Sequence, residues 1–178
     1  MAQAMPAPRV QEPPFSEEEI WEFQRAHPGW RIQVIGGSFV LSPPNNPESG
    51  RQNANRTRIL GNWTLKHGYQ CFDSSSGFRM PDGDVLAPDT SLMRNERWQM
   101  LAREQRKRFT PPPDVAVELL SKTDSIREMR RKCDRMHRDG TTFVVMLDPE
   151  NGIAECWGNA PEEFPDRRRL LRETVKED

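Results

Sequence analysis

The chain has no long hydrophobic run. A membrane-spanning helix needs about 18 or more consecutive apolar residues, and no such stretch occurs in this sequence. The opening segment MAQAMPAPRVQEPP also lacks the apolar core of a secretory signal. Because that segment is polar and rich in proline, we expect residues 1–14 to form a disordered tail. These absences predict a soluble, cytoplasmic protein that has no membrane partner.

Clusters of cysteine and histidine are absent as well. The chain has three cysteines and three histidines, with no CxxC pair and no Cys–His spacing typical of zinc sites. We therefore expect reduced thiols, no zinc centre and no Ser-His-Asp triad. The residues concerned are Cys71, Cys133 and Cys156, and His27, His67 and His137.

An excess of basic charge is the third absence. Lysine and arginine number 26 against 27 acidic residues, so the net charge is −1. Proteins dedicated to nucleic-acid binding usually carry a basic footprint, and the global charge therefore argues against avid DNA binding. Residues 103–108 and 167–169 are locally basic and could neutralise phosphates. A solvated helix face or a disordered tail explains such segments more often.

The patterns that are present fit one domain. Periodic apolar segments run from residue 15 to residue 159, and residues 160–178 read as a charged C-terminal tail. The mixture of helices and strands indicates an α/β or α+β fold with a mixed sheet. Predicted helices cover residues 16–26, 47–66, 95–106 and 124–139, and predicted strands cover 31–35, 38–42, 69–74, 77–80, 84–93, 114–121, 141–147 and 153–157.

Glu118 interrupts an otherwise apolar strand. In the segment DVAVELLS both faces of the strand are mostly apolar, which predicts a strand covered on both sides. A carboxylate buried there is unfavourable by several kcal/mol unless it is paired or bound to a metal. Glu118 therefore indicates either a chemical role or a structural salt bridge.

Asp89 stands in a similar setting, in the segment LAPDTSLM. If its strand neighbours the strand of Glu118, both acids can reach one hard cation. Magnesium prefers oxygen ligands and keeps several waters, and a divalent cation removes the repulsion between two close carboxylates. The alternative for Asp89 alone is the end of a strand or a turn, a common place for aspartate.

Lys132 lies beside the apolar stripe of the helix predicted over residues 124–139. At about 100° per residue, Lys132 is roughly 80° from the centre of that stripe. A long side chain at this shoulder can bend towards the sheet, although such lysines more often only extend to solvent. The stripe consists of Ile126, Met129, Cys133 and Met136.

The ordered segments resemble a known family. LAPDTSLM, followed by PPDVAVELLSKTDSIREMRRKCDRMHRDGTTFVVMLDPENGIAECW, is similar to the Uma-type putative restriction endonuclease family of the PD-(D/E)XK nuclease superfamily. GGSFVLSPPNNPE and GFRMPDGDVLAPD resemble its upstream segments, so the likeness covers about residues 30–158. It implies a restriction-endonuclease-like α/β core, with a mixed central sheet flanked by helices, that cleaves DNA.

The resemblance also implies a site. Asp89 and Glu118 would bind Mg²⁺, with Mn²⁺ as a second option, and the backbone carbonyl of Leu119 would be a further ligand. Many superfamily members carry a lysine two residues after the acid, where this chain has Leu120. Lys132 resembles a lysine that has moved to the following helix.

Glu48 matches a helix glutamate of the superfamily only in part. Related sequences tend to have a histidine directly after it, whereas this chain has Ser49. A carboxylate near a helix N-terminus is also favourable without any chemical role. Glu48 is therefore an additional candidate rather than a member of the main set.

Three functions stay open at this point. The first is a magnesium-dependent endonuclease acting on DNA, with a homodimer suited to paired strand breaks. The second is a catalytically inactive nuclease-fold domain that binds nucleic acid or protein, and the third is a structural domain with a buried ion-pair network. The enzyme predicts that Asp89, Glu118 and Lys132 converge on an open cleft. The interaction module predicts acids that are bound by arginines or covered by the tail.

Overall fold

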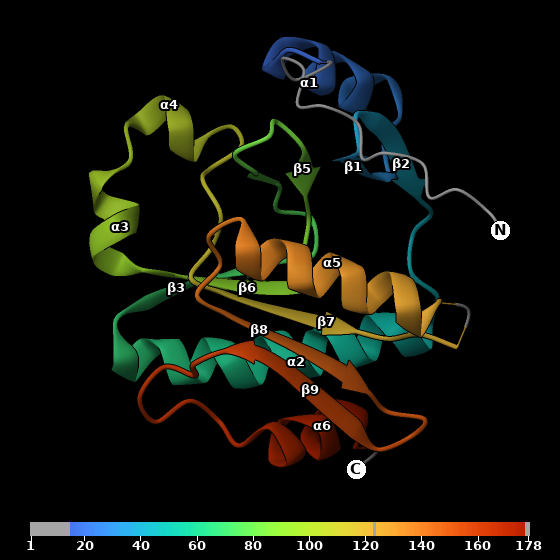
Figure 1. Cartoon of the computed structure of the whole chain (residues 1–178), viewed down its shortest axis with the longest axis vertical. Helices are drawn as coiled ribbons and strands as arrows, with labels where there is room; N and C mark the ends of the chain where they lie inside the picture. Colours follow the sequence, from blue (N-terminus) through green and yellow to red (C-terminus); the bar gives the residue numbers. More distant parts are fainter. Residues whose placement is uncertain (1–14, 123, 177–178) are drawn as a thin grey trace, which may run out of the picture.

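The computed structural model describes residues 15–122 and 124–176, so the tail expected over residues 1–14 lies outside the described part. The architecture is α/β, with a five-stranded sheet and a four-stranded sheet beside it (Figure 1). Within the described ranges, none of the helices combines the length and apolar character that crossing a membrane requires.

The five-stranded sheet has the order β3-β6-β7-β8-β9. Strands β7 and β8 are parallel, and the other neighbours are antiparallel. A parallel pair needs a crossover connection, and helix α5 forms it. These elements span Tyr69–Asp73 (β3), Thr90–Arg94 (β6), Val115–Leu119 (β7), Ile126–Arg138 (α5), Phe143–Asp148 (β8) and Ile153–Gly158 (β9).

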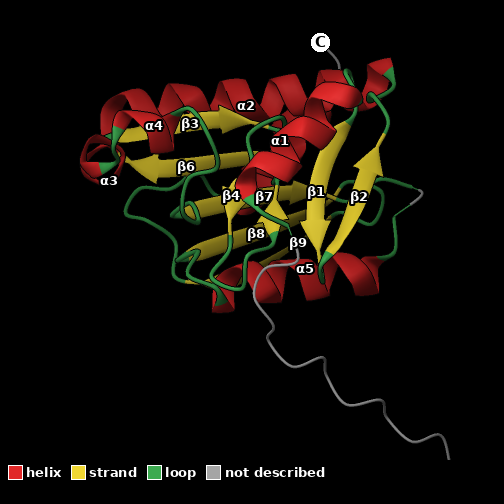
Figure 2. Ribbon diagram, turned by 90° about the horizontal axis from the view of Figure 1, so that it is seen from above, coloured by secondary structure: helices red, strands yellow, loops and turns green. Residues whose placement is uncertain are grey.

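Helices cover both faces of this sheet. Helices α2 (Pro47–His67) and α6 (Arg167–Val175) lie on one face, and α5 lies on the other (Figures 1 and 2). Because side chains alternate along a strand, Val115 and Val117 belong to the cluster with α2 and α6, whereas Ala116 packs with α5. Every residue of β7 is buried, which confirms the strand covered on both sides.

The four-stranded sheet, in the order β2-β1-β5-β4, is packed against α1. Its small core joins Ile20 of α1 to Val34 and Val85. The turn between β1 and β2 uses Gly36 and Gly37 at φ of 59° and 74°, the left-handed conformation that a two-residue hairpin requires. The elements span Glu17–Ala26 (α1), Arg31–Ile35 (β1), Ser38–Ser42 (β2), Phe78–Arg79 (β4) and Val85–Leu86 (β5).

Asp84 connects this smaller sheet to α5. Its carboxylate accepts hydrogen bonds from the N–H groups of Gly36 (2.5 Å) and Gly37 (3.2 Å), and it lies 2.6 Å from Nη1 of Arg135 on α5. The chain then passes from β5 through a short link to Asp89 and directly into β6. Asp89 therefore lies where the two sheets meet.

The segment predicted as a charged tail, residues 160–178, contains a helix. Helix α6 forms there, and Leu170 and Leu171 are 0% and 7% exposed within the main core. Two leucines among charged residues are too few to stand out in the sequence, yet on a helix they form a narrow apolar stripe that packs against α2 and the sheet. The folded domain therefore extends through Val175 and does not end at residue 159.

The single helix predicted over residues 95–106 is two short helices, α3 (Asn95–Met100) and α4 (Arg103–Arg106). The backbone between them is extended, with ψ of 133° at Leu101. This break allows Leu101 to join Trp98 against the apolar cluster on the α5 face of the sheet. Burial of an apolar side chain thus overrides the local helical preference.

Candidate active site

Asp89 precedes β6 and reaches the end of β7. Its Oδ2 accepts a hydrogen bond from the N–H of Leu119 (2.9 Å), and its Oδ1 accepts one from Nη1 of Arg31 (2.9 Å). Strand β6 pairs with β7 only up to Thr90, opposite Val117. Beyond that pair, the Asp89 carboxylate replaces a strand carbonyl as the acceptor for the N–H of Leu119. Both oxygens have partners, and the residue is 8% exposed.

Glu118 lies on β7 with its side chain on the α5 face, and it is 1% exposed. Nζ of Lys132, from α5, is 2.6 Å from Glu118 Oε1. Because Cys133 and Met136 anchor the buried stripe of α5, Lys132 lies at the edge of that stripe and bends inwards. The structure thus brings Asp89, Glu118 and Lys132 together at one end of the β6–β7 pair.

The two carboxyl groups differ in proton affinity. Burial alone would raise the pKa of Asp89, but the surrounding cations, Arg56 first among them, hold that pKa below its ordinary value. Burial raises the pKa of Glu118, while the charge of Lys132 opposes this rise only in part. Asp89 is therefore a fixed negative charge, and ionisation of Glu118 depends on the cations around it.

Arg56 is a site residue that the sequence reasoning missed. It is fully buried in α2, where its Nε donates to Thr90 Oγ1 (3.0 Å) and its Nη2 donates to Asn53 Oδ1 (2.7 Å). Arg56 precedes the buried Leu60 and Trp63 at helical spacing, so it falls on the apolar side of α2. An arginine on the apolar side of a helix indicates a buried positive charge, and this pattern could have identified Arg56 from the sequence.

The acids line a cleft with a volume of about 1070 Å³. We call it the acid cleft. Its walls come from the end of β7, from α5, from the start of α2 and from the segment that joins β2 to α2. The lining residues include Arg31, Pro43, Pro44, Asn45, Glu48, Asp89, Glu118, Leu119, Leu120 and Lys132.

Glu48 also borders the acid cleft, from the first turn of α2. Its carboxylate is exposed, and it accepts hydrogen bonds from Arg51 (2.9 Å) and Gln52 (2.7 Å). Leu120 borders the cleft too, and its N–H donates to Leu147 O (2.8 Å). The fold therefore brings Glu48 to the same cleft, but its partners are its own helix neighbours.

Basic side chains surround the two acids. Asp89 pairs with Arg31 and Glu118 pairs with Lys132, while the buried Arg56 interacts with both acids electrostatically. In the described ranges, no group of three or more His, Cys, Asp or Glu side chains could hold a metal ion. The basic residues 103–108 and 167–169 do not line the cleft.

Comparison with known proteins identifies the family. A family model described as "Uma2: Putative restriction endonuclease" matches residues 16–173. The chain belongs to this Uma2 family. The match exceeds the likeness over about residues 30–158 that the sequence showed, and it includes most of α6.

A solved structure places the Uma2 chain in a fold class. The chain is similar to the crystal structure of a putative nuclease belonging to DUF820 from Anabaena variabilis ATCC 29413, with a TM-score of 0.65 and 15% sequence identity. The similarity covers 82% of this chain and 91% of that chain. It confirms the restriction-endonuclease-like α/β fold. Among curated proteins, no match to the chain was found.

Proposed function

We propose that this Uma2 chain is a metal-dependent endonuclease that hydrolyses phosphodiester bonds in DNA. The observation that supports the proposal best is that Asp89, just before β6, Glu118 of β7 and Lys132 of α5 all line one cleft. Two buried carboxylates could hold a divalent cation, and that cation together with the nearby lysine would neutralise the negative charge that develops on the phosphate.

The donor set fits Mg²⁺, with Mn²⁺ as the alternative. Asp89 and Glu118 offer carboxylate oxygens, and magnesium is commonly held by one or two carboxylates while it keeps several waters. The N–H of Leu119 points to Asp89, and the carbonyl of a strand residue points to the same side as its N–H. We therefore assign Asp89, Glu118 and the Leu119 carbonyl as the metal ligands.

The chain's own residues would act as follows. When bound, the cation would polarise the scissile phosphate and lower the pKa of a coordinated water. Lys132 would release Glu118 and orient the attacking water or stabilise charge on the phosphate. Arg31 would leave Oδ1 of Asp89 and neutralise a phosphate of the bound strand. Glu48 stays an additional candidate at the rim of the cleft.

A second function has one observation in its favour. Asp89 is bound by Arg31 at 2.9 Å, as expected for an inactive nuclease-fold domain that binds nucleic acid or protein. The open acid cleft favours the enzyme, since an acid pair kept only for structure needs no such access. DNA is the proposed partner of the enzyme, and a homodimer would suit an enzyme that makes paired strand breaks.

Calorimetric titration with Mg²⁺ and Mn²⁺, followed by plasmid nicking with the same samples, tests the proposal. We expect the wild type to bind and nick, Glu118→Gln to lose both, and Lys132→Met to bind metal but nick at least about 100-fold more slowly. Glu155→Gln is the control, because Glu155 pairs with Arg130 outside the acid cleft. If wild type binds no metal, or if Glu118→Gln binds it equally well, the enzyme proposal is wrong.

A further inference from the structure

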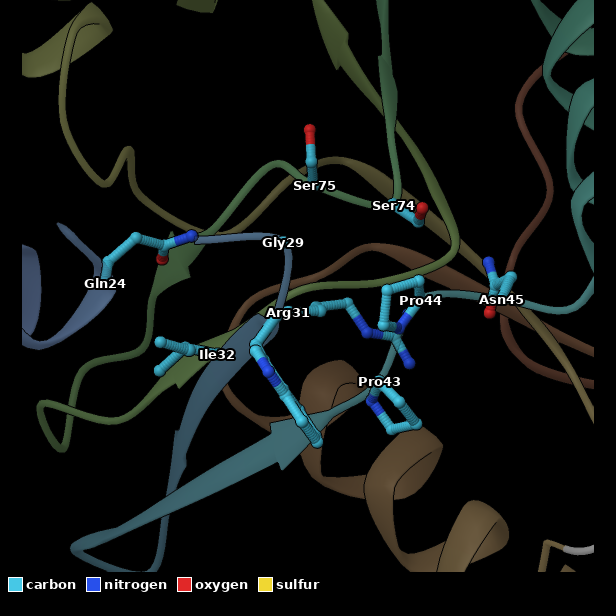
Figure 3. A pocket seen from close by; sticks show the side chains of 10 residues that line it. Gln24, Gly29, Arg31, Ile32, Pro43, Pro44, Asn45, Ser74 and Ser75 are labelled. Atoms are coloured by element: carbon cyan, nitrogen blue, oxygen red, sulfur yellow. The ribbon is translucent and has the colours of Figure 1, made fainter. Parts of the chain in front are cut away.

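A second, smaller pocket adjoins the acid cleft. It has a volume of about 320 Å³ and lies between the end of α1, the start of β1 and the segment leading into α2 (Figure 3). Arg31, Pro43, Pro44 and Asn45 line both spaces. We call it the side pocket. Because the two spaces share these residues, they lie side by side, and a strand in the acid cleft would pass next to the side pocket.

Trp30 lines the side pocket and is 42% exposed. Trp21, Trp63 and Trp98 each stack on or tilt against another ring, and Trp157 packs against the cluster near α5. In the described ranges Trp30 has no ring partner. A single exposed apolar side chain is ordinary. Trp30 is of interest because it is the residue directly before Arg31, whose guanidinium pairs with Asp89.

Hydrogen-bonding groups also line the side pocket. Figure 3 shows Gln24 of α1 on one side of it and Asn45 on the other, with Ser74 and Ser75 on a nearby turn. Over the described part of the chain, the side-chain amides of Gln24 and Asn45 have no hydrogen-bond partner. Amide groups of this kind both donate and accept, as the edge of an unpaired nucleobase does.

We propose that the side pocket is a subsite for an unpaired nucleotide of the substrate strand. The base stacks on Trp30, its edge meets Gln24 or Asn45, and Arg31 contacts its phosphate. Base stacking on an aromatic side chain requires a free face, which a base inside a continuous duplex does not offer. The pocket volume is near the lower end for small-ligand sites, about 300 Å³, and suits one base.

This inference rests on the proposed function, since it assumes that a nucleic-acid strand occupies the acid cleft. It adds the substrate class: DNA with an unpaired segment, such as a flap, a gap or a single strand, rather than a continuous duplex. The basic segments 103–108 and 167–169 lie outside both spaces. Recognition by stacking beside a single cation also agrees with the net charge of −1.

The test is equilibrium binding of the full chain to labelled oligonucleotides in EDTA, which prevents cleavage. A single strand of about 16 nucleotides is compared with its blunt duplex at one salt concentration, using wild type, Trp30→Ala and Trp30→Phe. Leu65→Ala is the control, because Leu65 is 84% exposed and lines neither space. A single strand carrying 2-aminopurine reports stacking directly through its fluorescence.

We expect Trp30→Ala to weaken single-strand binding between about 5-fold and 150-fold and duplex binding by less than about 2-fold. The 2-aminopurine quenching should vanish in Trp30→Ala and persist in Trp30→Phe and Leu65→Ala. Equal losses on single strand and duplex, or no loss in Trp30→Ala, would overturn the subsite while leaving the nuclease proposal intact. If wild type binds neither oligonucleotide, the proposed function itself fails. Thermal melts establish that each variant is folded.

Discussion

Removing Arg31 should strengthen metal binding. Nη1 of Arg31 lies 2.9 Å from Oδ1 of Asp89, and the two side chains are 27% and 11% exposed. A cation bound by Asp89 needs a carboxylate oxygen that the guanidinium now occupies. A methionine side chain at this position would retain most of the length without the charge, so Arg31→Met removes the competing cation and leaves the carboxylate pair in place.

The size of this effect follows from the burial of the pair. Exposed ion pairs contribute about 0.2–1 kcal/mol, and hydrogen bonds to charged groups contribute about 1.5–3 kcal/mol. A pair with one partner about a quarter exposed falls between these ranges, at about 1–2 kcal/mol. In the wild type a bound metal would have to displace Arg31 from Asp89, whereas in Arg31→Met this contact is already absent. The Mg²⁺ dissociation constant should therefore fall by about 5-fold to 30-fold in Arg31→Met.

Calorimetric titration with Mg²⁺ and Mn²⁺ at about pH 8 measures this change, at a pH where carboxyl groups are ordinarily ionised. Arg97→Met is a matched control, because Arg97 lies 2.8 Å from Asp114, with side-chain exposures of 35% and 9%, outside the acid cleft. It should leave metal affinity unchanged. If folded Arg31→Met binds metal no more tightly than wild type, Arg31 does not compete with the metal, and Asp89 Oδ1 is not a ligand.

Two further predictions concern stability. Burial raises the pKa of Glu118 above the 4.5 of a free glutamate, so the stability that its protonated form contributes is present below pH 4.5 and is lost as pH rises through the raised pKa. The metal-free Glu118→Gln variant should therefore gain unfolding free energy relative to wild type as pH rises from about 4 to about 8, and a pH-independent difference in urea melts would contradict this. Leu170→Ala should lower the unfolding free energy by about 2–5 kcal/mol, because Leu170 is fully buried in α6; a loss no larger than that of the exposed Leu65→Ala would show that α6 is not part of the core.

Much of the site follows from local sequence. The strand alternation around Glu118, the stripe of α5 beside Lys132 and the strand that follows Asp89 all appear in the sequence and recur in the structure. Each depends on a repeat of about 2 or about 3.6 residues, which neighbouring side chains establish by themselves. The resemblance to Uma-type sequences supplied the order of these parts.

The two site arginines did not follow from local sequence in the same way. Arg31 opens an ordinary strand, and its contact with Asp89 spans 58 positions. Arg56 reaches Thr90 across 34 positions, and only its place on the apolar side of α2 indicated burial. Helix α6 is a similar case, since the burial of its two leucines depends on α2 and the sheet, which are distant in the sequence.

The sequence by itself indicated most of the local elements, the burial of Glu118, and the order in which Asp89, Glu118 and Lys132 follow one another along the chain. Only the tertiary structure decided that these strands are neighbours, that a second sheet brings Arg31 to Asp89 and that the C-terminal segment closes the core. The physical reason is that backbone periodicity is set by adjacent residues, whereas strand pairing and buried charge depend on surfaces contributed by distant parts of the chain.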